Sequence, residues 1–328
     1  MSGADFGRFL ARSRERVARA RRAGGYSRDS RHTEADLYGT AAAVGIGIAL
    51  GMTPQGDDAE ELVEGLLALR DDAGMFRDRT HGPTHRAATA VTTIAALGGR
   101  PEAPEPLAGL LVAEAAPGFL DGLDWEHPWP ASHDAAGLLA IGLVTRTADI
   151  DERDRWASAY LAWLDAHADP ATGLWPAGGM GRLDDDPGLF GNLGCSFHIH
   201  FLYEHLGRRW PSPEGVVDTG LALLHDSEAV LACDDASTEW GFRQLDWVYS
   251  IGRAARCGHR TDEVDLSIAM LARRAATALD APEAVEVDLH VLQARVGLVA
   301  ELAVQAPEHV LTGEFPSLTS IVDVRPFI

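Results

Sequence analysis

The sequence contains no lysine, so all 28 basic residues are arginine. This absence excludes Schiff-base lysines, pyridoxal phosphate held on lysine and the lysine of a Walker P-loop. Cysteine is scarce, and Cys195, Cys233 and Cys257 are too scattered for a disulfide scaffold or a CxxC zinc site. No run of 18 apolar residues occurs, and the first residues lack the apolar stretch of a signal peptide. We therefore expect a cytoplasmic protein with no membrane partner.

Positive charge is also in short supply, since 49 acidic residues against 28 basic ones give a net charge of −21. This balance argues against nucleic acid as a partner. Apolar residues make up 46% of the 328 residues, which is enough for a folded core. The arginine-rich stretch at 7–22 is typical of a surface helix, so we divide the chain into an extension at 1–30 and a catalytic domain at 31–328.

Helical periodicity runs through almost the whole chain, because apolar residues recur at spacings of three and four. The segments predicted as helices are 34–50, 59–70, 85–97, 134–145, 152–166, 197–206, 214–225, 242–256, 262–279 and 288–305. The best candidate for a strand is the short run Val285-Glu286-Val287. We expect an all-α protein.

The loops between these helices repeat a pattern of a glycine turn with an aromatic residue, a polar helix start, an apolar helix and a second glycine turn. Three units begin near 72, 171 and 239 and end at Leu97-Gly98, Leu206-Gly207 and Cys257-Gly258. Repeated hairpins of this kind can close into an (α/α) toroid whose loops gather at one mouth. A solenoid or a plain helical bundle is the alternative.

The turn Asp169-Pro-Ala-Thr-Gly-Leu-Trp-Pro176 resembles those of terpenoid-cyclase and prenyltransferase toroids, six-hairpin glycosidases, polysaccharide lyases and sugar epimerases. Six blocks are similar to an uncharacterised bacterial helical-toroid family over residues 65–328. They are GMFRDRTHGPTH at 74–85, FLDGLDWEHPWPASH at 119–133, GCSFHIHF at 194–201, QLDWVYSIGRA at 244–254, DLHVL at 288–292 and VRPFI at 324–328. The resemblance implies a toroid with an active site at its mouth, and it brings no known reaction.

The sequence departs from the terpenoid cyclases at their acidic motifs. Neither DxDD nor DDxxD is present, and the triplet Asp184-Asp185-Asp186 and the pair Asp234-Asp235 do not replace them. Aromatic residues are only 7% of the chain, which is few for a cavity that guides carbocations.

The densest group of chemically active residues is the block from Asp121 to His133. We expect Asp124, Glu126 and His133 to act as acid and base, while Trp125 and Trp129 hold a sugar ring through its C–H faces. The alternative is a structural loop, in which Ser132 caps a helix that begins at Asp134.

Histidines supply the next candidates. His85 is expected to transfer protons and His81 to contact substrate; metal ligation by this HxxxH pair is an alternative that Pro83 weakens. His198 and His200 lie two residues apart and so face opposite sides of a helix, which lets at most one of them reach the site. We assign His198 to proton transfer and His200 to substrate contact.

The last candidates open two later helices. Asp246 is a candidate base, with helix capping as the alternative, and Trp240, Trp247, Tyr249 and His290 are expected to contact substrate. Asp288 has the same ambiguity between capping and catalysis.

Together these residues predict a toroid enzyme that hydrolyses, eliminates or epimerises a small carbohydrate or sugar-like substrate without metal or cofactor. A terpenoid-cyclase-like enzyme and a toroid that only binds a ligand or partner are the alternatives. The abundance of histidine beside acids favours an enzyme, because imidazole titrates near neutrality.

Overall fold

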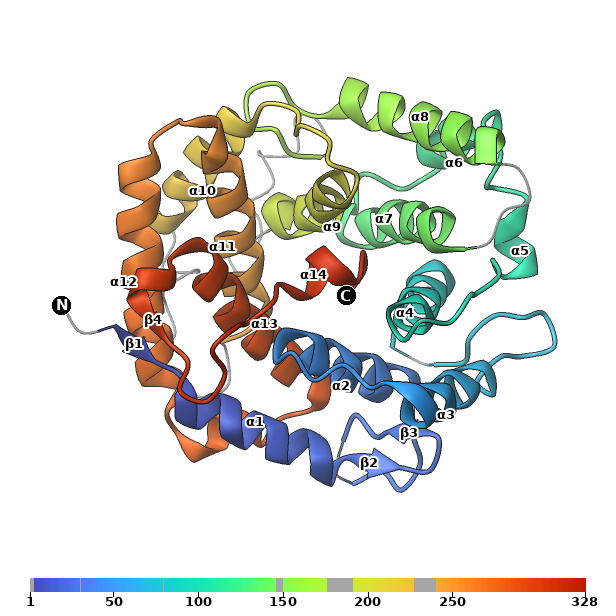
Figure 1. The fold of residues 1–328 in the computed structure, drawn as a ribbon. Coiled ribbons are helices and arrows are strands. Elements are labelled where there is room, and N and C mark those ends of the chain that lie inside the picture. The colour runs from blue at the N-terminus through green and yellow to red at the C-terminus, as the bar shows by residue number, and fades with distance from the viewer. Residues whose placement is uncertain (1–2, 30, 79, 146–149, 176–190, 227–239) are drawn as a thin grey trace.

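The computed structural model describes residues 3–29, 31–78, 80–145, 150–175, 191–226 and 240–328. This part of the chain is mostly helical, with sheet confined to two pairs of two-residue strands (Figure 1). Strand β1 (Ala4–Asp5) pairs in parallel with β4 (Val310–Leu311), and β2 (Arg21–Arg22) pairs antiparallel with β3 (Gly25–Tyr26). The predicted triplet Asp184–Asp186, the pair Asp234–Asp235 and Cys233 lie outside the described residues.

Six helices form the interior, and nearly all of their described side chains are buried. They are α2 (Leu37–Ala49), α4 (Pro83–Ala96), α7 (Pro128–Val144), α9 (Gly191–His205), α11 (Phe242–Ala254) and α13 (Leu289–Gln305). Each packs against the next in chain order, and α13 packs back against α2. Such helices must be apolar on all sides, which explains why their sequences are rich in alanine, leucine and valine.

The remaining long helices cover this interior and bury one face each. They are α1 (Gly7–Arg19), α3 (Gly56–Leu67), α8 (Ile150–His167), α10 (Pro213–Asp226) and α12 (Thr261–Leu279). Short helices α5 (Glu105–Ala108), α6 (Ala115–Asp121) and α14 (Ile321–Val324), together with the 3₁₀ turns η3 (Ala255–Cys257), η4 (Pro282–Val285) and η5 (Pro307–His309), complete the described part. No described helix is long and apolar enough to cross a membrane.

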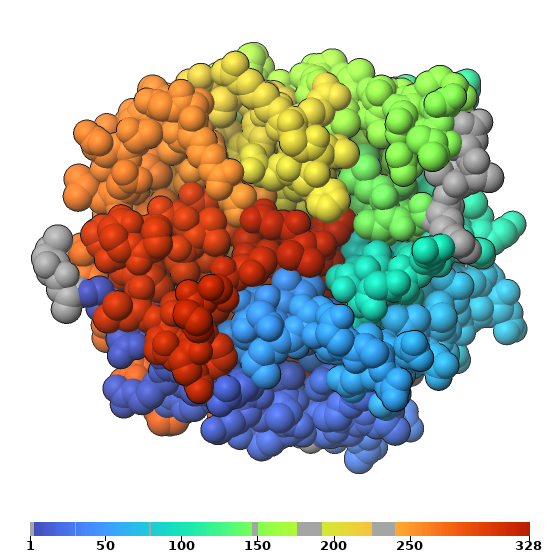
Figure 2. Space-filling view, viewed as in Figure 1, coloured from blue at the N-terminus to red at the C-terminus, as the bar shows by residue number. Residues whose placement is uncertain are grey.

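The C-terminal segment occupies the middle of the interior helices. Figure 1 places α14 and the end of the chain at their centre, and Figure 2 shows these residues filling the middle of one face. The Arg325 side chain is 1% exposed and donates to the carbonyl oxygens of Phe327 and Ala41 and to the Thr93 hydroxyl. These bonds tie the segment to α2 and α4.

The ten predicted helices are all confirmed to within several residues at their ends. The repeated glycine turns are also present, since Gly98, Gly207 and Gly258 follow inner helices with φ of 83°, 61° and 91°. Such left-handed backbone favours glycine because it has no Cβ. The predicted arginine-rich helix packs Phe9 and Leu10 into the same core as the rest of the chain.

Two local predictions are wrong. Val285 ends a 3₁₀ turn rather than lying in a strand, because the chain turns there into the N-terminus of α13. Ser132 lies inside α7, which begins at Pro128, and its hydroxyl donates to the Trp129 carbonyl oxygen instead of capping a helix. Proline is favoured in the first turn of a helix, so Pro128 and Pro130 mark the true start.

Candidate functional site

Five imidazoles from different parts of the chain meet in one group, which we call the imidazole cluster: His81, His85, His133, His198 and His290. Its rings contact one another in sequence, with centroid separations of 4.2 Å from His81 to His85, 4.6 Å from His85 to His133 and 4.6 Å from His133 to His198. His290 lies 5.9 Å from His81.

The packing order of the interior helices explains how these side chains come together. His85 is the third residue of α4, His133 the sixth of α7 and His290 the second of α13. His81 precedes α4, and His198 lies in the middle of α9. The amino ends of α4, α7 and α13 therefore converge with the middle of α9.

Other rings enclose the cluster. Tyr38 of α2 lies 4.7 Å from His81 and 5.7 Å from both His85 and His290. Further aromatic contacts come from Trp129 to His133 and His198, from Phe242 to His290, and from Phe327 to His85. The C-terminal segment thus reaches one side of the cluster through Phe327.

Exposure varies across the cluster. His85, His133 and His198 are 3%, 8% and 6% exposed, whereas His81 and His290 are half-buried. Trp129 is 42% exposed and its ring lies edge-on to His133 at 4.9 Å. The cluster therefore reaches the surface beside an exposed indole, which offers an apolar face to a ligand.

Burial keeps these imidazoles neutral. It lowers the pKa of His198 to about 4 and the pKa of His290 to about 3, the latter with help from the positive charge of Arg28. It also lowers the pKa of His85 and of His133 well below the ordinary value, and repulsion from neighbouring imidazoles adds to this effect. The His81 pKa is lowered chiefly by burial. A neutral imidazole can accept a proton, and rings this close oppose a second protonation.

Two hydroxyls are hydrogen-bonded directly into the cluster. The Tyr38 Oη atom lies 2.8 Å from His85 Nδ1, and Thr89 Oγ1 lies 3.4 Å from the same nitrogen. Burial raises the pKa of Tyr38, so its hydroxyl stays protonated and can donate to Nδ1. The His198 Nδ1 atom is buried and has no partner among the described residues.

Within the described residues, no three side chains of histidine, cysteine, aspartate or glutamate are arranged as a metal-ligand set. The imidazoles stack or meet edge to face. The arrangement is suited to proton transfer and hydrogen bonding.

The predicted carboxylates of the turn before α7 lie at the surface. Asp124 Oδ2 lies 2.8 Å from His127 Nδ1, and both side chains are mostly exposed. Glu126 is exposed as well. Trp125 donates from Nε1 to the Leu120 carbonyl oxygen, which anchors the turn. A catalytic role for Asp124 and Glu126 stays a prediction.

Asp246 is the fifth residue of α11 and so does not cap this helix. It is 4% exposed, and burial raises its pKa well above the ordinary value, which favours the neutral acid. Burial also raises the pKa of the Cys195 thiol to about 12. Asp288, in contrast, caps α13 by accepting from the backbone N–H groups of His290 and Val291.

The other predicted contact residues lie in packed surroundings. His200 stacks on Trp210 at 4.0 Å, on the opposite side of α9 from His198, as their spacing requires. Trp247 donates to the Gly220 carbonyl oxygen, and the Trp240 carbonyl oxygen accepts from Arg295. Tyr249 is fully buried beneath the guanidinium of Arg253 at 4.8 Å.

Sequence reasoning missed Tyr38, Arg28 and Phe327. Tyr38 stands at the start of an apolar helix with no neighbouring motif, and Arg28 belongs to a loop that only the fold brings to α2. The Arg28 guanidinium lies 5.9 Å from the Tyr38 ring centroid. Phe327 belonged to a recognised block, VRPFI, whose position in the interior the sequence does not reveal.

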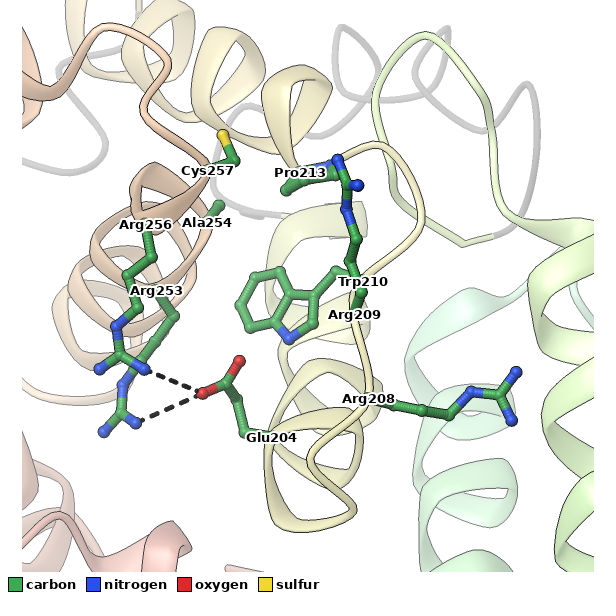
Figure 3. A pocket seen from close by; sticks show the side chains of 9 residues that line it. All are labelled: Glu204, Arg208, Arg209, Trp210, Pro213, Arg253, Ala254, Arg256 and Cys257. Carbon is green, nitrogen blue, oxygen red and sulfur yellow. Dashed lines mark hydrogen bonds and ion pairs between the residues drawn. The ribbon is translucent and has the colours of Figure 1, made fainter.

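A separate cavity of about 380 Å³ lies at the carboxyl ends of α9 and α11 (Figure 3). Arginines line it, and all of them contact carboxylates: Arg208 pairs with Asp165, Arg209 with Glu214, Arg256 with Glu204, and Arg253 with Glu204, Glu301 and Asp323. Cations at helix carboxyl ends are also stabilised by the helix dipole. We assign these arginines to the stability of the fold.

No family model matches the chain, and comparison with curated proteins and with solved structures gives no match. We therefore infer function from the geometry of the imidazole cluster.

Proposed function

We propose that this chain is an α/α-toroid enzyme that moves protons on a sugar or a sugar-like polyhydroxylated molecule. The closed sequence of contacts among the six interior helices supports the toroid, with α1, α3, α8, α10 and α12 as its outer layer. The imidazole cluster then lies at one end of the ring. The observation that carries the function is the convergence of five imidazoles whose burial keeps them neutral.

The chemistry that this cluster supports is abstraction of a proton from carbon next to a carbonyl or carboxylate group. One imidazole accepts the proton and becomes an imidazolium, while the electron pair moves into the substrate as an enediolate. For isomerisation, the imidazolium returns the proton to the neighbouring carbon while the hydroxyl proton moves from one enediolate oxygen to the other. For elimination, the electron pair forms a C=C bond, the C–O bond to the β-oxygen breaks, and the imidazolium protonates that leaving oxygen. The Tyr38 hydroxyl can donate to the developing oxyanion in the tautomer in which His85 Nδ1 carries the hydrogen of their hydrogen bond.

Elimination or isomerisation fits this site better than hydrolysis. Glycosidases usually act through two carboxyl groups that flank the scissile bond. The predicted carboxylates Asp124 and Glu126 are exposed, and the groups gathered with Trp129 are imidazoles. The exposed Trp129 ring supplies the apolar surface on which a sugar ring can stack.

The test is proton exchange in D₂O, followed by ¹H NMR over a panel of aldoses, ketoses, uronic acids and N-acetylated amino sugars. We expect the native chain to remove one C–H signal from a substrate or to produce a vinyl proton. His133→Gln and His85→Gln should each lower the rate at least 100-fold, which is the size of a general acid–base contribution.

His127→Gln is the matched control, because this imidazole is exposed and lies outside the imidazole cluster, where it pairs with Asp124. It should keep the native rate. Absence of exchange on every sugar, or native rates in both cluster variants, would contradict the proposed function. Circular dichroism of each variant separates loss of chemistry from loss of folding.

A further inference from the structure

Positive charge flanks the imidazole cluster on two sides, although the chain as a whole is strongly acidic. Arg28 lies over Tyr38, and Tyr38 contacts both half-buried imidazoles of the cluster, His81 and His290. The side chain of Arg28 is 24% exposed, so it stands where the cluster meets solvent.

Local structure fixes the position of Arg28. Its backbone N–H donates to Asp36 and its carbonyl oxygen accepts from Leu289, so the segment is attached to α2 and α13. Its Nη2 atom lies 3.3 Å from Asp288 Oδ2, while the other oxygen of Asp288 caps α13. This long contact orients the guanidinium and leaves its remaining donors for a ligand, since no other carboxylate pairs with Arg28 among the described residues.

Arg325 supplies the second charge. It is buried beside Phe327, which contacts His85, and it bonds only to two carbonyl oxygens and a hydroxyl. Among the described residues no carboxylate lies within ion-pair distance of it. A buried cation without a counter-ion is costly, and an anion bound nearby offsets part of that cost.

We infer that the natural substrate carries a carboxylate, bound by the Arg28 guanidinium beside His81 and His290. This inference rests on the proposed function and names its substrate class as acidic sugars such as uronic acids. A carboxylate matches the planar fork of arginine. A phosphate dianion fits less well, because Asp288 already places a negative charge at 3.3 Å from the same guanidinium. A carboxylate next to the reacting carbon also acidifies the proton that the imidazole removes.

Binding distinguishes this inference from the reaction itself. Calorimetric titration with D-glucose, D-glucuronate and glucose 6-phosphate, with His133→Gln as the protein, measures affinity where turnover should be minimal. We expect glucuronate to bind at least tenfold more tightly than the other two ligands. Its affinity should fall as salt is raised, because salt screens the exposed guanidinium.

Arg28→Gln, introduced into the His133→Gln protein, should lower the affinity for glucuronate at least tenfold. The affinity for glucose should not change. Arg28→Lys keeps the positive charge but loses the planar guanidinium. Its affinity for glucuronate should lie between those of the protein with Arg28 and of the Arg28→Gln variant. Arg31→Gln is the matched control: Arg31 lies on the same loop, is 84% exposed and pairs with Asp29. The Arg31→Gln variant should bind glucuronate with the same affinity as the His133→Gln protein that keeps Arg31.

Equal affinity for glucose and glucuronate, a preference for glucose 6-phosphate, or unchanged binding in Arg28→Gln would overturn the inference. Those results leave the proposed function intact if neutral sugars exchange protons in D₂O. Conversely, selective glucuronate binding without exchange on any sugar supports the carboxylate site and overturns the proposed reaction.

Discussion

Histidine is used here in two ways that depend on burial. His127 and His259 lie at the surface and pair with Asp124 and Asp218. In contrast, His85, His133 and His198 of the cluster are buried and form no ion pair with a carboxylate among the described residues. A buried imidazole without a counter-charge is more stable when neutral. At neutral pH the cluster therefore holds uncharged imidazoles, each with one nitrogen lone pair.

This neutrality predicts a loss of stability in mild acid. His198 has an ordinary pKa of 6.5 when unfolded and a pKa of about 4 when folded, so between these values the unfolded chain binds a proton that the folded chain does not. The free energy of unfolding should thus be highest above pH 6.5 and fall by about 1.4 kcal/mol per pH unit for each such imidazole as the pH drops.

Urea denaturation at pH 7.5, 6.0 and 5.0 measures this slope. His198→Gln should reduce this slope by the contribution of one imidazole, about 1.4 kcal/mol per pH unit. An identical slope in the native chain and His198→Gln would show that this imidazole titrates normally in the folded state.

Residue types identified the histidines as candidates but did not predict the geometry of the cluster. The spacing of His198 and His200 showed that they face opposite sides of a helix, yet it did not reveal which side is the interior. The block around Asp124 has the highest density of reactive side chains, but density does not determine burial, and this turn is exposed. Tyr38 and Arg28 join the site through contacts that no sequence pattern records.

At the scale of elements, close approach between backbone segments positions the site. Gly39 lies on α2 where the loop that carries Arg28 crosses it, and a Cβ added there would lie 2.3 Å from the Arg28 backbone nitrogen. The loop has to move to admit even a methyl group. Periodicity predicted the ten long helices, since it depends on the local chain, whereas these crossings depend on the whole fold.

Gly39→Ala should lower the free energy of unfolding by about 1–3 kcal/mol through overpacking, and it should weaken glucuronate binding by displacing Arg28. Gly118→Ala in α6 is the control, because nothing lies within 4 Å of its added Cβ. Alanine there should be neutral or stabilise the helix by up to about 1 kcal/mol. Equal effects of the two changes on unfolding and binding would refute this role for Gly39.

At the scale of the whole molecule, the six interior helices and the C-terminal segment have different structural roles. The helices bring imidazoles from residues 81 to 290 into one group, and Arg325 and Phe327 fill the space among them. The apolar composition of the last residues gave no sign of this central position. A site assembled from so many segments depends on the complete fold, so acid or mutation that loosens the packing should affect stability and ligand binding together.

The most direct test of this account is ¹⁵N NMR of the histidine side chains at pH 7 and pH 5, with and without glucuronate. We predict that the imidazoles of His85, His133 and His198 stay neutral at both pH values. Their ¹⁵N resonances should shift on addition of glucuronate. The resonances of His127 and His259 should not respond to glucuronate. Cluster imidazoles that protonate near pH 6.5, or a ligand response confined to surface histidines, would contradict a neutral imidazole site that binds an acidic sugar.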